Sequence, residues 1–137
     1  MDDLYRDEIL EHYRRPHNFG TLEHPDLSYE GANPLCGDRM TLMLDLDEGG
    51  TVTDVAFTGR GCAISQASAS LLTDTLRGRT TTELGRLAKD DVLELLGIEI
   101  SPARLKCALL SLDTLQRALA ERPAGTVTTP NAVEVRA

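Results

Sequence analysis

Three cysteines and one aspartate, drawn from three separate parts of the sequence, constrain the fold of this chain more than any other feature. Cys36 lies two residues before Asp38, whereas Cys62 and Cys107 are distant from both and from each other. Thiolates and carboxylates are metal ligands, and neither side chain is stable when it is buried alone. The four groups make one tetrahedral ligand set. The fold is therefore expected to bring Cys62 and Cys107 to the Cys36 loop.

The length and charge of the chain limit its class. A chain of 137 residues predicts one domain, which we place at residues 1–122. Residues 123–137 consist mainly of Pro, Gly, Thr, Asn, Ala and Val without periodicity, and are expected to form a flexible tail. The net charge of −8 and the pI near 4.8 argue against nucleic acid, whose phosphates require Lys and Arg. They favour partners with a basic face.

The pattern of apolar residues indicates neither a membrane protein nor a secreted one. No apolar run approaches the ~20 residues that a membrane helix needs. The start, Met1–Leu4, lacks the cationic and apolar regions of a signal peptide, so we expect a cytoplasmic protein. Disulfides are rare in that reducing compartment, and three cysteines leave one thiol over under any pairing. Metal binding or thiol chemistry is therefore the favoured interpretation.

Hydrophobic periodicity predicts helices at both ends of the chain and strands between them. Met40, Leu42, Leu44 and Leu46 alternate with more polar residues, which is the period of a strand. The turn at 47–50 joins this strand to a second one and predicts an antiparallel hairpin, with Cys36 and Asp38 just before it. The expected strands are 27–31, 40–46 and 52–58, and the expected helices are 3–15, 63–77, 80–87, 92–96 (capped by Asp90 and Asp91) and 102–121.

The surroundings of the two later cysteines favour a chemical role over a structural one. Cys62 follows Gly59-Arg60-Gly61 at a strand-to-helix turn, an unusual place for a core residue, although a buried structural cysteine is the alternative. Cys107 lies about 120° from the middle of the apolar stripe of its helix, so it is expected to be a ligand or a reactive thiol. Arg104 and Lys106 flank it and would favour a charged thiolate nearby. The stripe consists of Leu105, Ala108, Leu109, Leu112, Leu115 and Leu119.

Two of the three histidines lie near the end of the first predicted helix. We interpret His12 and His17 as helix-end and turn residues, with a metal or catalytic role as the alternative. His24 lies in a polar loop and is not assigned a function.

Three thiolates and one carboxylate suit zinc or iron. Three cysteines cannot supply a four-cysteine cluster cage from one chain. A cluster bound here would use Asp38 or an outside ligand and would be labile, as a delivery protein requires.

Four ordered motifs resemble those of one protein family. Cys36-Gly37-Asp38, Gly59–Ser65 and Pro102–Ala108 are similar to the three cysteine signatures of the NifU N-terminal/IscU/SufU iron–sulfur assembly family. Glu11–Gly20 resembles its N-terminal signature, and the similarity extends over residues 4–120. The resemblance implies an α+β fold of the SufE/NifU-like type, in which several α-helices pack against a three-stranded antiparallel β-sheet.

The resemblance also implies a function, for which two branches of the family differ. Lys106 stands where the scaffold (IscU) branch has a histidine, and this resembles the SufU branch. In that branch, zinc would bind Cys36, Asp38, Cys62 and Cys107, and Cys36 would accept persulfide sulfur from a cysteine desulfurase. Apo iron–sulfur proteins or downstream assembly factors would be the further partners.

Two alternatives stay open. The short interval between Cys62 and Cys107 resembles the scaffold branch, in which a labile [2Fe-2S] cluster is built on the protein. The other alternative is a domain that zinc stabilises, without thiol chemistry.

Overall fold

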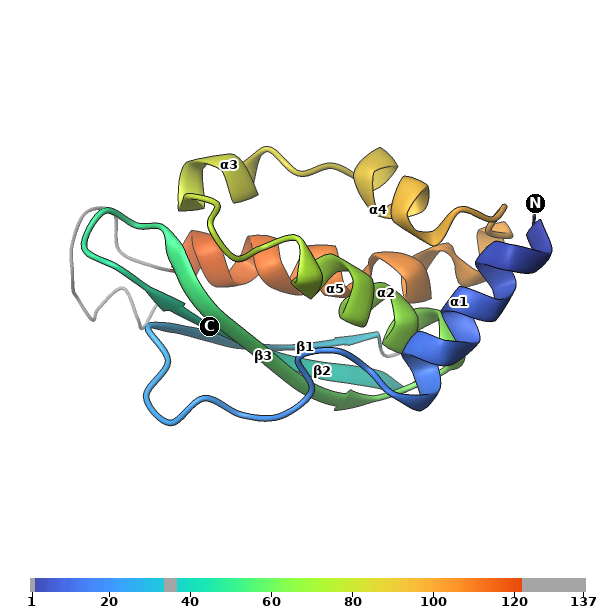
Figure 1. Ribbon diagram of the computed structural model, residues 1–137, viewed down its shortest axis with the longest axis horizontal. Coiled ribbons are helices and arrows are strands. Elements are labelled where there is room, and N and C mark those ends of the chain that lie inside the picture. The colour runs from blue at the N-terminus through green and yellow to red at the C-terminus, as the bar shows by residue number, and fades with distance from the viewer. Residues whose placement is uncertain (1, 34–36, 122–137) are drawn as a thin grey trace.

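The computed structural model has the predicted α+β architecture (Figure 1) and describes residues 2–33 and 37–121. Cys36 and the predicted tail, 123–137, lie outside these residues. Within the described part, no helix combines the length and apolar character needed to cross a membrane. The elements are α1 (Asp2–Arg14), β1 (Leu27–Asn33), β2 (Asp38–Leu46), β3 (Val52–Arg60), α2 (Ala63–Asp74), α3 (Thr81–Gly85), α4 (Lys89–Leu96) and α5 (Pro102–Glu121).

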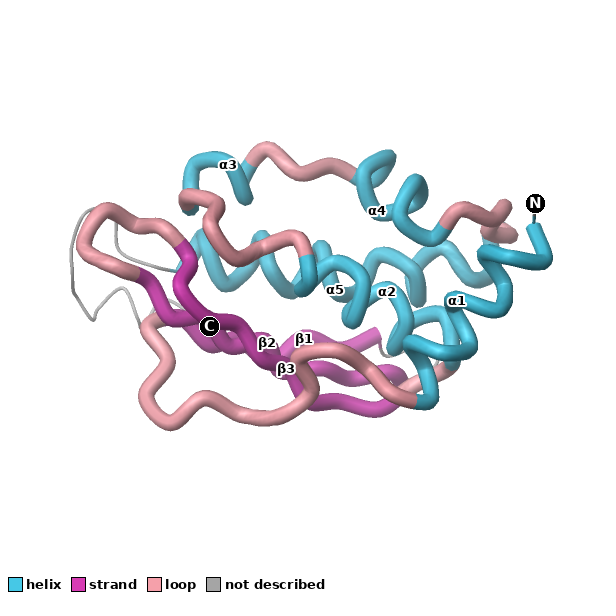
Figure 2. Tube along the Cα trace, viewed as in Figure 1, coloured by secondary structure: helices cyan, strands magenta, loops and turns pink. Residues whose placement is uncertain are grey.

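The three strands form one antiparallel sheet in the order β1-β2-β3. Helices α2 and α5 cover one face of this sheet, and α3 and α4 form a further layer beyond them (Figures 1 and 2). On the covered face, Leu42 pairs with Phe57 and Leu44 pairs with Val55, and all four side chains are buried. Side chains alternate between faces along a strand. The hairpin predicted from this alternation is therefore correct.

The same alternation determines which face of the sheet the Asp38 side chain is on. Asp38, predicted to lie in the loop before the strand, is instead the first residue of β2 and pairs with Asn33 of β1. It is separated from Met40 and Leu42 by steps of two residues, so it belongs to the row that faces the helices. Its side chain is only 3% exposed. The sheet thus directs a carboxylate towards α2 and α5.

The outer edge of β3 is covered by two segments from elsewhere in the chain. Phe57 accepts a backbone hydrogen bond from the Gly20 N–H and donates one to the Asn18 carbonyl, each 2.9 Å long. Val52 likewise accepts a backbone hydrogen bond from the Gly78 N–H and donates one to the Arg79 carbonyl, each 2.9 Å long. Both segments satisfy backbone groups that an uncovered edge strand would leave open.

Small residues allow α2 and α5 to pack closely. The hydroxyl of Ser68 on α2 donates to the carbonyl oxygen of Ala108 on α5 at 2.6 Å, and it lies 3.1 Å from the Ser111 hydroxyl. Ser68 and Ser111 are each 1% exposed, so these bonds satisfy polar groups that burial would otherwise leave without partners. This contact holds the first half of α5 beside the middle of α2.

Several helix boundaries differ from the predictions by a few residues. Helix α2 ends at Asp74 rather than 77. Helix α4 begins at Lys89, so Asp90 and Asp91 lie in its first turn, where the Asp91 carboxylate accepts the Ala88 N–H at 2.8 Å.

The buried face of α5 also differs from the predicted stripe. Cys107, predicted to lie off this face, is only 5% exposed, and Leu105 and Leu109 are only partly buried. The reason is that α5 packs against both the sheet and α2, so a wider side of it is covered than one narrow stripe. The buried residues of α5 are Cys107, Ala108, Leu110, Ser111, Leu112, Thr114, Leu115 and Ala118.

Candidate metal centre

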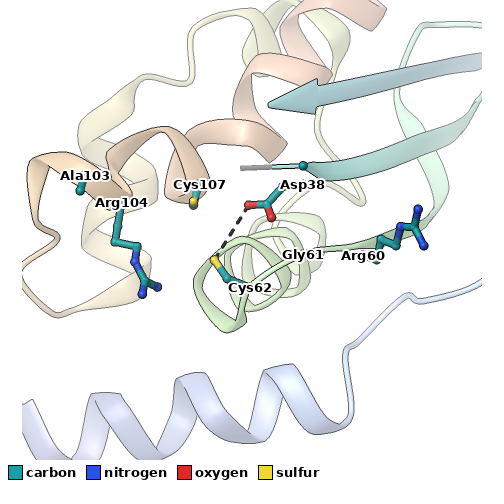
Figure 3. A pocket seen from close by; sticks show the side chains of 8 residues that line it. Asp38, Arg60, Gly61, Cys62, Ala103, Arg104 and Cys107 are labelled. Carbon is teal, nitrogen blue, oxygen red and sulfur yellow. Dashed lines mark hydrogen bonds between the residues drawn. The ribbon is translucent and has the colours of Figure 1, made fainter. Parts of the chain in front are cut away.

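Three of the four predicted ligands meet at one end of the sheet. Asp38 begins β2, Cys62 is the N-cap residue of α2, and Cys107 lies in the second turn of α5. One ligand atom from each lies within 4.8 Å of the others, and the Cys62 thiol lies 3.9 Å from Asp38 Oδ2 (Figure 3). Asp38 and Cys107 are buried, whereas Cys62 is half-buried. The fold therefore gathers two sulfurs and one carboxylate around one point.

These three groups fit a tetrahedral zinc ion. Zn–S bonds of about 2.3 Å and Zn–O bonds of about 2.1 Å place sulfur and oxygen ligands roughly 3.6 Å apart. The 3.9 Å between Cys62 Sγ and Asp38 Oδ2 is close to this separation, so bond formation requires only small side-chain movements. The fourth predicted ligand, Cys36, is outside the described residues. In sequence it is two residues from Asp38.

The turn before Cys62 is shaped by a buried glutamine that sequence reasoning did not identify. The side-chain oxygen of Gln66, on the first turns of α2, accepts the backbone N–H groups of Arg60 and Gly61, each at 3.2 Å. Gln66 is 8% exposed. It therefore holds the end of β3 against the start of α2 and positions Cys62 between them. The signal available in the sequence was a polar residue four positions after a helix-capping cysteine.

Gly61 leaves space for the Asp38 carboxylate. A β-carbon at this position would lie 2.6 Å from Asp38 Oδ1 and 2.5 Å from Ser65 Oγ. Both distances are shorter than non-bonded atoms tolerate. Because Asp38 and Ser65 are buried, neither can turn towards solvent without leaving the site.

Gly61→Ala is therefore expected to displace Asp38 and to weaken zinc binding by at least about tenfold, the smaller effect reported for residues that support metal ligands. The added methyl group should also lower the free energy of unfolding by roughly 1–3 kcal/mol, as overpacking does. Zinc competition with a chromophoric chelator measures the first effect, and denaturant unfolding measures the second. The matched control is Gly85→Ala, because Gly85 in α3 is exposed and has no atom within 4 Å of the added carbon. Equal zinc affinity of the two variants would contradict this role of Gly61.

An open cavity of about 580 Å³ lies over the three groups. Arg60 and Arg104 contribute to its lining, and both are exposed. They flank the two sulfur atoms on opposite sides, and the Arg60 side chain points away from them (Figure 3). Lys106, the other predicted supporting residue, is exposed and is not among the residues that line the cavity. The rim is therefore cationic, although the chain as a whole is acidic.

Comparisons with known proteins identify the family of the chain. Residues 4–128 match the family model of the NifU-like N terminal domain. The chain is 36% identical over 142 aligned positions to the zinc-dependent sulfurtransferase SufU of Bacillus subtilis, covering 91% of this chain and 95% of the relative. It is also 36% identical to the iron–sulfur cluster assembly enzyme IscU of Drosophila melanogaster, over 86% of this chain and 77% of the relative.

A solved structure supports the same assignment. The fold superimposes with a TM-score of 0.69 and 30% identity on a crystal structure from Fervidobacterium islandicum, described as a candidate iron–sulfur cluster assembly scaffold protein for the SUF system. The match covers 82% of this chain and 94% of that one. The family predicted from the cysteine motifs is confirmed, and the chain belongs to the NifU-like N-terminal domain family of iron–sulfur cluster assembly proteins.

Proposed function

We propose that this chain is a zinc-bound sulfur acceptor for iron–sulfur cluster assembly, which takes persulfide sulfur from a cysteine desulfurase. The observation that carries the proposal is the convergence of Asp38, Cys62 and Cys107 within 4.8 Å, from three separate parts of the sequence. The similarity to SufU, which is named as zinc-dependent, supports zinc as the ion. Lys106, exposed beside Cys107, stands in place of a metal-binding histidine and supports the acceptor role over the scaffold role.

The proposed ligands are Cys36, Asp38, Cys62 and Cys107, and Cys36 is the proposed acceptor. Zinc, when bound, keeps the thiols deprotonated and fixes their positions. Asp38 is the hardest of the four ligands, so it lets the ligand set rearrange more readily than a fourth thiolate would. Arg104 stands at the cavity rim, where its positive charge favours thiolates and an anionic persulfide.

The transfer itself is thiol exchange. The Cys36 thiolate attacks the terminal sulfur of the desulfurase persulfide. A sulfur–sulfur bond forms on Cys36, the sulfur–sulfur bond of the desulfurase breaks, and the desulfurase cysteine leaves as a thiolate. No outside oxidant or reductant takes part. The open cavity beside the ligands gives the persulfide-bearing segment of the desulfurase a route of approach. We place the exchange in the cytoplasm, and apo iron–sulfur proteins or downstream assembly factors are the proposed recipients of the sulfur.

Metal content and sulfur loading test the proposal together. The chain purified in air is expected to contain one zinc ion, and incubation with its cognate desulfurase and cysteine should add the mass of one sulfur atom to the peptide that contains Cys36. A zinc-containing chain that gains no sulfur under these conditions would support a structural zinc domain instead.

A cluster scaffold is the second candidate function. The similarity to IscU of Drosophila melanogaster favours it, and a carboxylate among three thiolates would make a bound [2Fe-2S] cluster labile. Asp38→Ala distinguishes the candidates. A longer lifetime of a reconstituted cluster in this variant, measured by its visible absorption, would favour the scaffold. If no cluster can be reconstituted on either chain, the acceptor function is favoured.

A further inference from the structure

A second group of metal-ligating side chains lies at the opposite end of α2 from Cys62. His12 belongs to α1, His17 lies in the turn that follows, and Asp74 is the last residue of α2. One ligand atom from each lies within 4.8 Å of the others. His12 is 6% exposed, whereas His17 and Asp74 are exposed. The cluster therefore combines a fixed buried ligand with two that solvent can reach.

Hydrogen bonds hold each of these side chains in place. His17 Nδ1 lies 2.6 Å from Asp74 Oδ2, and the Asn18 amide donates to Asp74 Oδ1 at 3.0 Å. The Ser70 hydroxyl lies 2.6 Å from His12 Nδ1 and accepts the backbone N–H of His17 at 2.7 Å. Outer partners of this kind orient metal ligands and fix which ring nitrogen carries a proton.

The distances allow an ion to enter with small movements. Bonds of about 2.0–2.2 Å to nitrogen and oxygen place two ligand atoms roughly 3.0–3.5 Å apart. The 2.6 Å contact between His17 and Asp74 must therefore open by less than about 1 Å as the ion replaces the shared proton. The side chains of His17 and Asp74 are 52% and 39% exposed, so they are able to move in this way, while buried His12 stays as the anchor.

The charges near the cluster favour a cation. Asp74 supplies one negative charge, and Glu8 and Glu11 on α1 are near enough to act on His12 electrostatically. Arg15 is paired with Glu11 at 2.7 Å. Burial, and to a smaller extent His17, lowers the pKa of His12, and neutral imidazole is the form that metal ions bind. The environment therefore supplies a neutral His12 imidazole in a negative field.

From this arrangement we propose that His12, His17 and Asp74 form a second metal site, which binds a divalent first-row transition ion. Two imidazoles and one carboxylate, with further positions left for water, are the ligand set of non-haem iron(II) and of three-ligand zinc sites. The site is independent of the thiolates, because the twelve residues from Cys62 to Asp74 separate the two by roughly 18 Å of helix. Bound there, the ion links α1 and its following turn to the end of α2.

The test uses the complete chain with its thiolate site already filled by zinc, and Ni²⁺ as the probe. Calorimetry is expected to show one equivalent of Ni²⁺ bound without release of zinc. The chain has three histidines, and His24 is exposed and outside the cluster, so it serves as an internal control. The imidazole proton resonances of His12 and His17 should broaden at low Ni²⁺ concentrations, whereas those of His24 should not.

Two variants and one control complete the test. His17→Ala and Asp74→Asn should each lower the Ni²⁺ affinity by at least about tenfold, as the loss of a ligand or of its orienting partner does. Asp54→Asn removes an exposed carboxylate that pairs with Arg77 elsewhere, and should leave the affinity unchanged. Wild-type affinity in Asp74→Asn, or equal broadening of all three histidines, would show that the cluster only fastens α1 to α2 and would overturn the proposal. Circular dichroism and zinc content confirm that each variant is folded.

Discussion

Replacing Cys36 with alanine is expected to reduce cysteine turnover by the cognate desulfurase to the rate that the desulfurase has without this chain. The proposed exchange forms a sulfur–sulfur bond on Cys36, and alanine has no atom that can take part. The persulfide would then stay on the desulfurase and block its next turnover. Alanine production in the presence of cysteine and excess chain measures this effect.

Alanine substitution of Cys62 distinguishes loss of the sulfur acceptor from loss of the metal. Cys62→Ala removes one proposed ligand but keeps Cys36, so it should lose zinc while mass spectrometry still detects sulfur on Cys36. If Cys36→Ala stimulates turnover as well as the wild type does, the transfer function is wrong. A Cys36→Ala chain whose only defect is a lower free energy of unfolding would indicate a structural zinc domain.

Asp38→Asn is expected to have the second largest effect, a loss of zinc affinity of roughly 100-fold. Zinc binding worth about 10–16 kcal/mol, shared among four ligands, gives about 3 kcal/mol for each. Asparagine has the same shape as aspartate but lacks the charge that makes it a good zinc ligand. Competition against a chromophoric chelator at fixed pH measures the change.

Unfolding experiments distinguish this loss from simple destabilisation. Because the free energy by which zinc stabilises the folded chain grows with the logarithm of its affinity, zinc should raise the unfolding midpoint of the wild type more than that of Asp38→Asn. With zinc removed by a chelator, the two chains should unfold at similar denaturant concentrations. Asp45→Asn, the same change further along β2, is the control and should keep the full response to zinc. Equal responses in both variants would rule out Asp38 as a ligand.

The local sequence was sufficient to predict the elements that carry the two distant cysteines. Ser101 and Pro102 mark the start of α5 correctly, and Gly59-Arg60-Gly61 marks the end of β3 and the start of α2 at Cys62. The face of the sheet on which the Asp38 side chain lies was also predictable, because Asp38 is two residues before Met40 and side chains alternate along a strand. The predicted strand begins at its first apolar residue, Met40, and therefore leaves Asp38 out.

Features that depend on packing between distant elements were not predictable in this way. Cys107 is buried because α5 meets the sheet and α2 together, and one helix's periodicity does not reveal how wide its covered side is. His12 and His17 were interpreted as helix-end and turn residues. Their partner Asp74 lies more than fifty positions away, and only the docking of α1 on α2 brings it near them.

The segment that covers β3 limits how other proteins can attach to this sheet. Strand addition, in which a partner's extended peptide joins a sheet, requires open backbone groups at an edge. At Phe57 those groups are already bonded to Asn18 and Gly20 of the same chain. A visiting peptide would have to displace this segment, and with it the turn that holds His17 against Asp74. At Phe57 and Val52, recognition at this edge therefore relies on side chains, and a second copy of the chain cannot add a strand there without displacing these segments.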